Sequence, residues 1–177
     1  HSSDTYMNGA VVGYDNNKGD ILSLQFLNDG NEHPSRDIIN NNLLNGENGR
    51  LGNIEVGRNN NGETDDFLCP QGSGIYRIDT VHKSKNKQEN GGIDGIKFYC
   101  RDLKTGKNIK IKDSKNRINH GVHFGIEPKS NISGKYIYRS AQCPEIINRN
   151  GNKLHSFIGG YTAYHDKRIH GLKVNKC

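Results

Sequence analysis

One short pattern occurs three times in this chain and limits what it can fold into. In each copy apolar and polar residues alternate, which is typical of a strand with one buried face. The three copies span residues 20–28, 92–100 and 168–177, and the last two end on a cysteine. Leu24, Ile96 and Leu172 occupy matching positions, 72 and 76 residues apart. This regular spacing predicts one structural unit used three times, with loops of varying length.

The composition favours strands over helices and one domain over several. The chain has 177 residues with 22 glycines and 4 prolines, and Asn-Gly, Asp-Gly and Gly-Gly pairs recur along it. Such pairs form the tight turns of β-hairpins, and no segment keeps a helical period over several turns. We therefore predict a single all-β domain over residues 1–177. Its repeat units cover approximately residues 4–66, 67–142 and 143–177.

Four cysteines allow three disulfide pairings, and the repeat selects one of them. Hydrophobic residues make up only 31% of the chain, so cross-links would help to stabilise a small core. A Cys69–Cys100 bond and a Cys143–Cys177 bond would each join the start of a unit to its closing strand. A zinc site is the alternative, but the chain has no Cys-x-x-Cys pair. Paired structural cysteines in turn predict an oxidising compartment.

The chain is basic, with a formal net charge of +6, and part of this charge is concentrated in one loop. Lys83, Lys85 and Lys87 alternate with other residues between two predicted strands. Such a surface attracts phosphates, anionic lipid headgroups or sulfated glycans. The alternative is that these lysines only solvate exposed strand faces. Nucleic acid is not an expected partner, because aromatic residues are not interleaved with the basic ones and disulfides indicate another compartment.

Two motifs of the second unit resemble those of a known family. They are Phe-Leu-Cys-Pro-x-Gly at residues 67–72 and Gly-Ile-Asp-Gly-Ile-Lys-Phe-x-Cys-x-Asp at residues 92–102. This combination resembles the repeat of the vitelline membrane outer layer protein 1 family, whose units run from Cys-Pro-x-Gly to an Asn-Asn/Gly-Ile-Arg-Phe-x-Cys strand. The first unit of this chain has Asn28 in place of the second cysteine. In the third unit Cys177 falls one residue late, which requires a β-bulge or a turned end.

The resemblance implies both a fold and a function. In the vitelline family three units form a β-prism, in which three antiparallel sheets pack around a pseudo-threefold axis, and the proteins are secreted into extracellular coats. The C-terminal β-prism domain of apicomplexan perforin-like proteins is similar, and it brings a pore-forming protein to membranes. We therefore expect a β-prism of three antiparallel sheets built from three internal repeats, in a secreted or cell-surface protein.

Aromatic and polar residues of the third unit form a candidate ligand site. Tyr161 and Tyr164 precede His165 and Asp166, and aromatic faces beside hydrogen-bonding groups suit sugar rings. The alternative is a strand whose tyrosines pack on the face of a sheet. Glycosidase chemistry needs two carboxylates that converge across a cleft, one with a raised pKa. The available carboxylates are those of Asp65, Asp66, Glu89 and Asp94. Nothing in the sequence fixes their geometry, so no catalytic residue is assigned.

The chain is not expected to bind a metal or a cofactor. His120 and His123 have a spacing that suits a metal only on a helix or in a tight turn, and Gly121 in a β context favours exposed loop histidines. Asn131 begins an Asn-Ile-Ser acceptor site for N-glycosylation. No apolar run is long enough to span a bilayer, and the first residues do not resemble a signal peptide, so a secreted form would already have lost its signal.

The function that we predict is that of a non-catalytic module that attaches to glycans or to membrane surfaces through its loops. The alternatives are the membrane-targeting domain of a pore-forming protein and a glycan-processing enzyme. Exposed aromatic or apolar loop tips beside lysines would indicate membrane docking, whereas a concave groove with Tyr and Asn or Asp would indicate sugar binding. A deep cleft with two carboxylates of strongly shifted pKa would indicate an enzyme.

Overall fold

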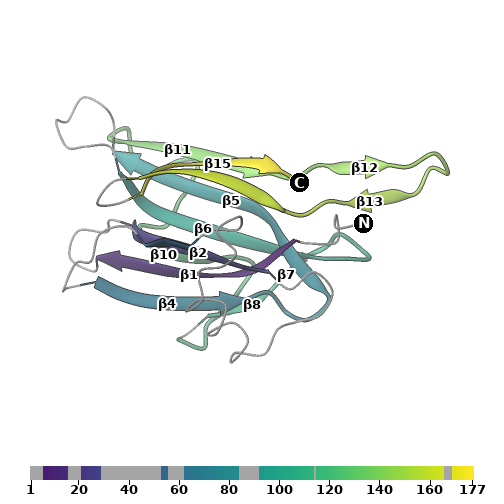
Figure 1. The fold of residues 1–177 in the computed structure, drawn as a ribbon, viewed down its shortest axis with the longest axis horizontal. Coiled ribbons are helices and arrows are strands. Elements are labelled where there is room, and N and C mark those ends of the chain that lie inside the picture. Colours follow the sequence, from purple (N-terminus) through teal and green to yellow (C-terminus); the bar gives the residue numbers. More distant parts are fainter. Residues whose placement is uncertain are drawn as a thin grey trace.

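The computed structural model describes residues 6–15, 21–28, 53–55, 62–83, 92–113, 115–165 and 169–177. These residues form the strands β1 to β15 and no helix, and every strand pairing among them is antiparallel (Figure 1). None of the described residues therefore belongs to a helix that could cross a membrane. The prediction of an all-β chain with antiparallel sheets is confirmed.

The first sheet is built on a hairpin of β1 and β2. Its four strands stand in the order β3 (Asn53–Glu55), β2 (Ile21–Asn28), β1 (Met7–Asp15) and β4 (Gly62–Leu68). In the hairpin Val12 lies opposite Leu24, and both side chains are buried. Phe26 is two residues beyond Leu24, so it points to the same buried face of β2.

The second sheet is built on the longer hairpin of β5 and β6. Its main strands stand in the order β10 (Val122–Gly125), β6 (Ile93–Asp102), β5 (Ser73–Lys83) and β11 (Tyr136–Gln142), and β7 (Asn108–Ile109) also pairs with β6. Ile96 and Phe98 are completely buried, whereas Lys97 and Tyr99, which alternate with them, are partly exposed. The alternation that predicted this strand thus separates its core face from its outer face.

The first and second sheets have the same topology. In each, the four main strands stand in the spatial order third, second, first and fourth, counted along the chain; in the second sheet the short strands β7, β8 and β9 lie between β6 and β10 in sequence. This is the Greek-key arrangement, in which three consecutive strands pair and the fourth returns beside the first. The first and second sheets therefore share one strand order.

The third sheet contains two strands among the described residues, β14 (Gly160–His165) and β15 (Ile169–Lys176). These correspond to the first and second strands of the other two sheets. Two short hairpins complete the described strands: β8 (Ile111–Lys112) with β9 (Ile118–Asn119), and β12 (Glu145–Ile147) with β13 (Lys153–His155).

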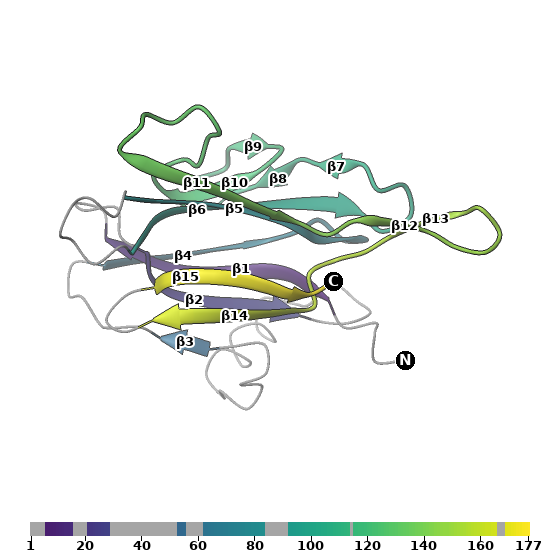
Figure 2. The same cartoon turned by 90° about the horizontal axis from the view of Figure 1, so that it is seen from above.

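The three sheets meet at one core. Figure 2 shows the first and third sheets on the same side of the second sheet. Phe26 of β2 contacts Phe98 of β6, with ring centroids 5.9 Å apart, and Tyr161 of β14, with centroids 4.5 Å apart. Leu172 and Val174 of β15 are partly buried and pack against the same cluster. One strand pair from each predicted unit thus contributes to a common core.

Both predicted disulfides, Cys69–Cys100 and Cys143–Cys177, are present. The second one requires an irregular strand, because Cys177 lies one residue too late. This irregularity is a β-bulge: Gly160 pairs with Lys176 but Tyr161 pairs with Val174, so Asn175 of β15 has no partner on β14. The disulfides are consistent with an oxidising compartment.

Backbone hydrogen bonds join the three units at one end of the molecule. The N–H of Met7, at the start of the first unit, donates to the carbonyl of Ile158 in the third. The N–H groups of Ile158 and Cys143 donate in turn to the carbonyls of Ile75 and Tyr76 in the second unit, at 2.9 and 2.8 Å. We call this set of bonds the unit junction.

Candidate functional site

The hairpin of β12 and β13 projects from one end of the molecule, beyond the three sheets (Figures 1 and 2). Its turn is closed by a backbone hydrogen bond of 2.9 Å from the Asn148 N–H to the Asn152 carbonyl. The Asn148 side-chain oxygen accepts two more bonds, from the N–H groups of Asn150 and Asn152. Gly151 has a φ of +79°, a conformation that glycine adopts without strain. The turn chemistry of this segment therefore explains why the hairpin forms.

This hairpin carries most of the large apolar residues that are exposed in the described part of the chain. The exposed fraction is 51% for Ile146, 68% for Ile147 and 50% for Leu154, and outside the hairpin it is 60% for Ile118. Ile146 lies directly opposite Leu154, so these two form an apolar pair on one face of the hairpin, while Ile147 points to the other face. Exposed apolar side chains that gather on one projecting element mark an interaction surface.

Two cations accompany the apolar side chains. Arg149 at the turn and Lys153 on β13 are both exposed. The Nζ atom of Lys153 lies 3.8 Å from a carboxylate oxygen of Glu145, and because both groups are exposed this ion pair is weak. The hairpin therefore presents apolar and cationic groups side by side.

A buried arginine holds the base of the hairpin. Arg101 on β6 is only 2% exposed. Its Nη2 atom lies 2.6 Å from the carbonyl oxygen of Ser156, which follows β13, and 3.3 Å from those of Cys143 and Pro144, which precede β12. One guanidinium thus binds the chain on both sides of the hairpin. We call this contact the Arg101 clamp.

Aromatic rings surround the Arg101 clamp. The guanidinium carbon lies 4.7 Å from the centroid of the Tyr76 ring and 5.5 Å from that of Phe157, distances that allow cation–π attraction. Burial lowers the pKa of Arg101, although a guanidinium stays charged at any physiological pH. The clamp is therefore a charged contact that fixes where the hairpin leaves the second sheet.

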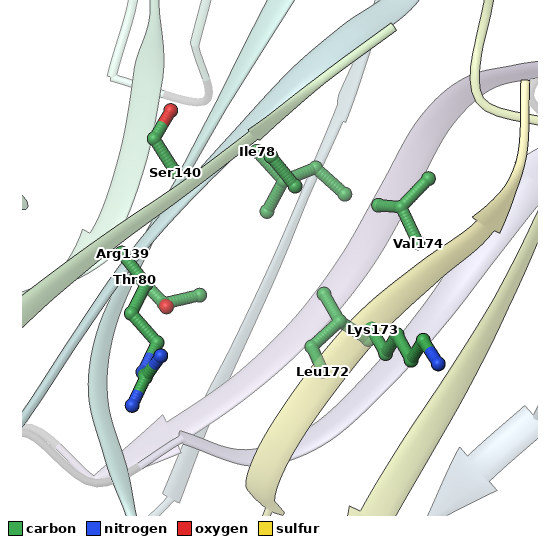
Figure 3. A pocket seen from close by; sticks show the side chains of 8 residues that line it. Ile78, Thr80, Arg139, Ser140, Leu172, Lys173 and Val174 are labelled. Carbon is green, nitrogen blue, oxygen red and sulfur yellow. The ribbon is translucent and has the colours of Figure 1, made fainter.

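A cleft separates the second sheet from the third, with a cavity of about 250 Å³ (Figure 3). It lies between β5 and β11 on one side and β15 on the other. Its lining residues are Ile78, Thr80, Arg139, Ser140, Ala141, Leu172, Lys173 and Val174. The lining is apolar at the bottom, where Ile78 is buried, and carries the exposed cations Arg139 and Lys173 at its margin. Among the described residues, neither an aromatic side chain nor a carboxylate lines this cleft.

A polar cluster on the outer face of the second sheet lies next to the cleft. The carboxylate of Asp79 is 1% exposed and accepts hydrogen bonds from Arg77, Tyr99, Tyr138 and Ser140. Burial, followed by the negative charge of Asp79, raises the pKa of Tyr99. With four donors around one buried carboxylate, this cluster stabilises the packing of three neighbouring strands.

Among the predicted ligand residues, the structure describes the surroundings of Tyr161. Lys83 ends β5, and Lys85 and Lys87 lie outside the described residues. Tyr161 lies on β14, where its ring packs against Phe26 at 4.5 Å and burial raises its pKa. A tyrosine in this position contributes to packing, which was the alternative to sugar binding.

The other members of the aromatic cluster lie at the end of the same strand. Tyr164 and His165 are the last two residues of β14, and Asp166 lies outside the described residues. Asn131, the predicted glycosylation site, is exposed in the connection before β11.

The two histidines considered as metal ligands are in different environments. His120 is exposed, whereas His123 lies on β10, half-buried, with its Nδ1 atom 3.5 Å from a carboxylate oxygen of Glu127. Burial lowers the pKa of His123. Within the described ranges, no three His, Cys, Asp or Glu side chains are grouped as metal ligands would be.

Among the described carboxylates considered for catalysis, which are Asp65, Asp66 and Asp94, none lines the cleft. Asp65 accepts a hydrogen bond of 2.6 Å from the hydroxyl of Tyr14, which also contacts Glu63 at 3.1 Å. Asp94 is buried in the second sheet at 1% exposure, and Glu89 lies outside the described residues.

The projecting hairpin was missed at the level of sequence. The signal for it was present, because Ile146 and Ile147 precede an Asn-Arg-Asn-Gly-Asn segment that is followed by Leu154. Two apolar stretches around a turn rich in Asn and Gly indicate a hairpin. The repeat drew attention instead to the strands that its pattern shares, and this hairpin has no counterpart among the described residues of the other two units.

Comparison with models of known protein families, with characterised proteins and with solved structures finds no match to this chain. A functional assignment must therefore come from the geometry described above.

Proposed function

We propose that this protein is a secreted β-prism module that binds anionic membrane surfaces through the hairpin of β12 and β13. The observation that carries the proposal is the concentration of exposed apolar side chains on one projecting element, with two cations beside them. The disulfides support a location in an oxidising compartment, such as the extracellular space.

The β-prism part of the proposal rests on the repeated units. Each predicted unit contributes a hairpin to a different sheet, and the hairpins meet at the rings of Phe26, Phe98 and Tyr161. Two of the three sheets share the Greek-key order. Three related sheets around one core are the arrangement that the resemblance to the vitelline membrane outer layer protein 1 family implies.

The membrane part rests on the chemistry of the hairpin. Apolar side chains that enter the boundary between headgroups and acyl chains lose their contact with water, which is favourable. Exposed Arg149 and Lys153 would remain at the level of the headgroups, where each cation contributes about 1 kcal/mol near an anionic surface. The apolar pair of Ile146 and Leu154 provides a face that can lie on the bilayer.

Sugar binding has less support from the geometry. Sugar rings stack on exposed aromatic faces, and among the described residues none lines the cleft between the second and third sheets. Tyr161, which was the aromatic candidate, packs against Phe26. The membrane-targeting role of the perforin-like β-prism is in line with the proposal.

Co-sedimentation with liposomes tests the proposal. The protein is mixed with neutral phosphatidylcholine vesicles and with vesicles that contain phosphatidylserine, at low and at high salt. We expect binding to the anionic vesicles that weakens as salt is added, because salt screens the cations. Absence of binding to vesicles of either composition would refute the proposal.

A pair of matched variants locates the contact. Replacing Ile146 and Ile147 with serine removes two exposed apolar side chains and is expected to weaken vesicle binding by roughly tenfold or more. Ile118→Ser is the control, because Ile118 is similarly exposed at 60% but lies on β9. Equal losses in the hairpin variant and the control would show that the hairpin is not the binding element.

A further inference from the structure

Among the described strands, β15 of the third sheet has a neighbouring strand on one side only. The equivalent strand in each of the other two sheets has a neighbour on both sides. In the first sheet the second strand, β2, pairs with β3, and in the second sheet β6 pairs with β10. The equivalent strand of the third sheet is β15, and in the described part of the chain it pairs only with β14. The edge of β15 that β14 does not cover faces the cleft (Figure 3).

We propose that this cleft binds an extended segment of a partner protein, which adds to β15 as a third strand. The chemistry is that of β-strand addition, in which backbone hydrogen bonds provide affinity and alternate side chains enter apolar sites. The opposite wall of the cleft is β11, which is the other edge of the second sheet. The occupant would therefore lie between two strand edges, at the place that β10 occupies beside β6.

The second sheet indicates which side chains the segment needs. On β6, Ile96 lies opposite Phe124 of β10, and Phe98 lies opposite Val122. Both Phe124 and Val122 are buried, so the apolar residues of the third strand complete the core at these positions. The sequence repeat equates Ile96 with Leu172, and by the same register Phe98 with Val174.

Among the described residues, no third strand covers Leu172 and Val174 of β15. Leu172 and Val174 are only partly buried, although they pack against the core cluster, and both line the cleft. Ile78 of β5 lies opposite them at the bottom of the cleft (Figure 3). Two apolar side chains of an added strand, spaced by two residues, would cover Leu172 and Val174 as Phe124 and Val122 cover Ile96 and Phe98.

The charges at the margin determine the residue between the two apolar ones. Lys173 lies between Leu172 and Val174, is exposed, and corresponds to Lys97 of β6. Arg139 of β11 is exposed on the other wall. Neither cation forms an ion pair among the described residues, whereas Lys97 lies 3.8 Å from the carboxylate of Glu127. A residue of the occupant that faces Lys173 and Arg139 is therefore acidic.

The preferred segment is thus an apolar–acidic–apolar triplet in extended conformation, antiparallel to β15. Following the register of β10, Val-Glu-Phe would place valine opposite Val174, glutamate opposite Lys173 and phenylalanine opposite Leu172. Opposite charges at facing positions of neighbouring strands stabilise the pairing.

The test uses a fluorescein-labelled peptide, Ser-Thr-Val-Glu-Phe-Thr-Ser, and the oxidised full chain, with fluorescence anisotropy as the readout. We expect saturable binding that Lys173→Glu weakens roughly fivefold, because an attraction between facing side chains becomes a repulsion. The peptide with Val-Lys-Phe in place of Val-Glu-Phe should bind the Lys173→Glu variant better than the unchanged chain. Lys173 is exposed, so its replacement leaves the fold intact.

Backbone methylation distinguishes strand addition from simple occupation of a pocket. One peptide is N-methylated at valine and phenylalanine, and another is N-methylated at glutamate. In an extended segment the amides of valine and phenylalanine point to one edge and the amide of glutamate points to the other, so each peptide loses the hydrogen bonds of one edge. At least one of the two is expected to lose most of its affinity. Unchanged affinity of both, or failure of the charge exchange at Lys173, would overturn the proposal.

Two further measurements test whether the peptide binds at the cleft and not at the projecting hairpin, and whether a second copy of the chain occupies the cleft. The Ile146→Ser, Ile147→Ser variant should bind the peptide as the unchanged chain does, because the hairpin is not part of the cleft. Sedimentation velocity shows whether a second copy occupies the cleft instead. Dimerisation that Lys173→Glu abolishes, without peptide binding, would overturn the assignment to a partner segment.

Discussion

Replacing Arg101 with methionine tests how the hairpin is held. Methionine keeps an unbranched apolar stem beside Tyr76 and Phe157 but removes the donor of the Cys143 and Ser156 carbonyl groups. The Pro144 carbonyl still accepts a hydrogen bond from the Ser156 hydroxyl. One Nη2 nitrogen has two hydrogens, so it can satisfy two of the three carbonyls well. The bond to Ser156, at 2.6 Å, is the shortest of the three.

The expected loss of stability follows from two opposing effects. Each carbonyl left without a partner costs about 1–3 kcal/mol, which gives about 2–6 kcal/mol for two. The variant also no longer has to bury a guanidinium that has no carboxylate of the described residues at ion-pair distance, and this recovers part of the cost. We expect the free energy of unfolding to fall by about 2 kcal/mol.

Urea denaturation of the oxidised protein measures this change, and limited proteolysis shows whether the hairpin becomes more accessible. Arg149→Met is the control, because Arg149 is exposed at the turn of the same hairpin and its loss should change stability by less than about 0.5 kcal/mol. An Arg101→Met variant as stable as the unchanged protein would refute the reasoning, since it would mean that the cost of burying the charge cancels its hydrogen bonds.

Three further predictions concern the second and third units. Gly95→Ala should destabilise the protein by about 2 kcal/mol or more, measured by thermal unfolding, because a Cβ there would overlap the Ile126 carbonyl oxygen. Replacing Cys143 and Cys177 with serine should lower the free energy of unfolding by about 4 kcal/mol in urea, since the bond closes a loop with a sequence separation of 34. Burial lowers the pKa of His123 from 6.5, so the folded state favours the neutral ring, and the stability that this provides should be lost as the pH falls from about 7 towards 5.

Each of these has a control. Gly134→Ala should be nearly neutral, because no atom lies within 4 Å of a Cβ placed there; an equal effect of both glycine variants would contradict the steric argument. Dithiothreitol should destabilise the unchanged protein more than the serine variant, which keeps only the Cys69–Cys100 bond, and equal effects would mean that the Cys143–Cys177 bond contributes nothing. His123→Gln should flatten the decline of stability between pH 7 and 5, and an unaltered decline would assign it to other groups.

The parts of the fold that the sequence predicts well are those that a local residue pattern determines. Alternation of apolar and polar residues identified β2, β6 and β15, each of which contributes side chains to the core. The disulfide pairing followed from the repeat. The late position of Cys177 required a bulge or a turned end, and β15 has a bulge. These features depend on local patterns and on their spacing along the chain.

The parts that were not predicted depend on long-range pairing. The strand β11 has exposed or half-buried residues throughout, so no apolar pattern marks it, yet it pairs with β5 over seven positions. The Arg101 clamp was equally invisible, because an arginine at the end of an alternating strand is normally a solvated residue. Whether such a side chain is buried depends on what the third unit places above it.

The candidate site was not predicted either, because it also depends on the tertiary structure. The sequence directed attention to aromatic and basic residues, because these carry recognisable chemistry. Tyr161 has a place in the core instead, and the exposed side chains that matter for the proposed function are Ile146, Ile147 and Leu154. Exposure of an apolar side chain is a property of the tertiary structure, and no rule for single residues predicts it.

The unit junction has a consequence for how the three units depend on one another. Its bonds run from the first unit to the third and from the third to the second, so a unit taken alone would lose backbone partners that only another unit provides. Separate chains of one unit each could regain them only by assembling, and their folding would then depend on protein concentration. Joining the units in a single chain removes that dependence, and we expect the three sheets to unfold in one transition.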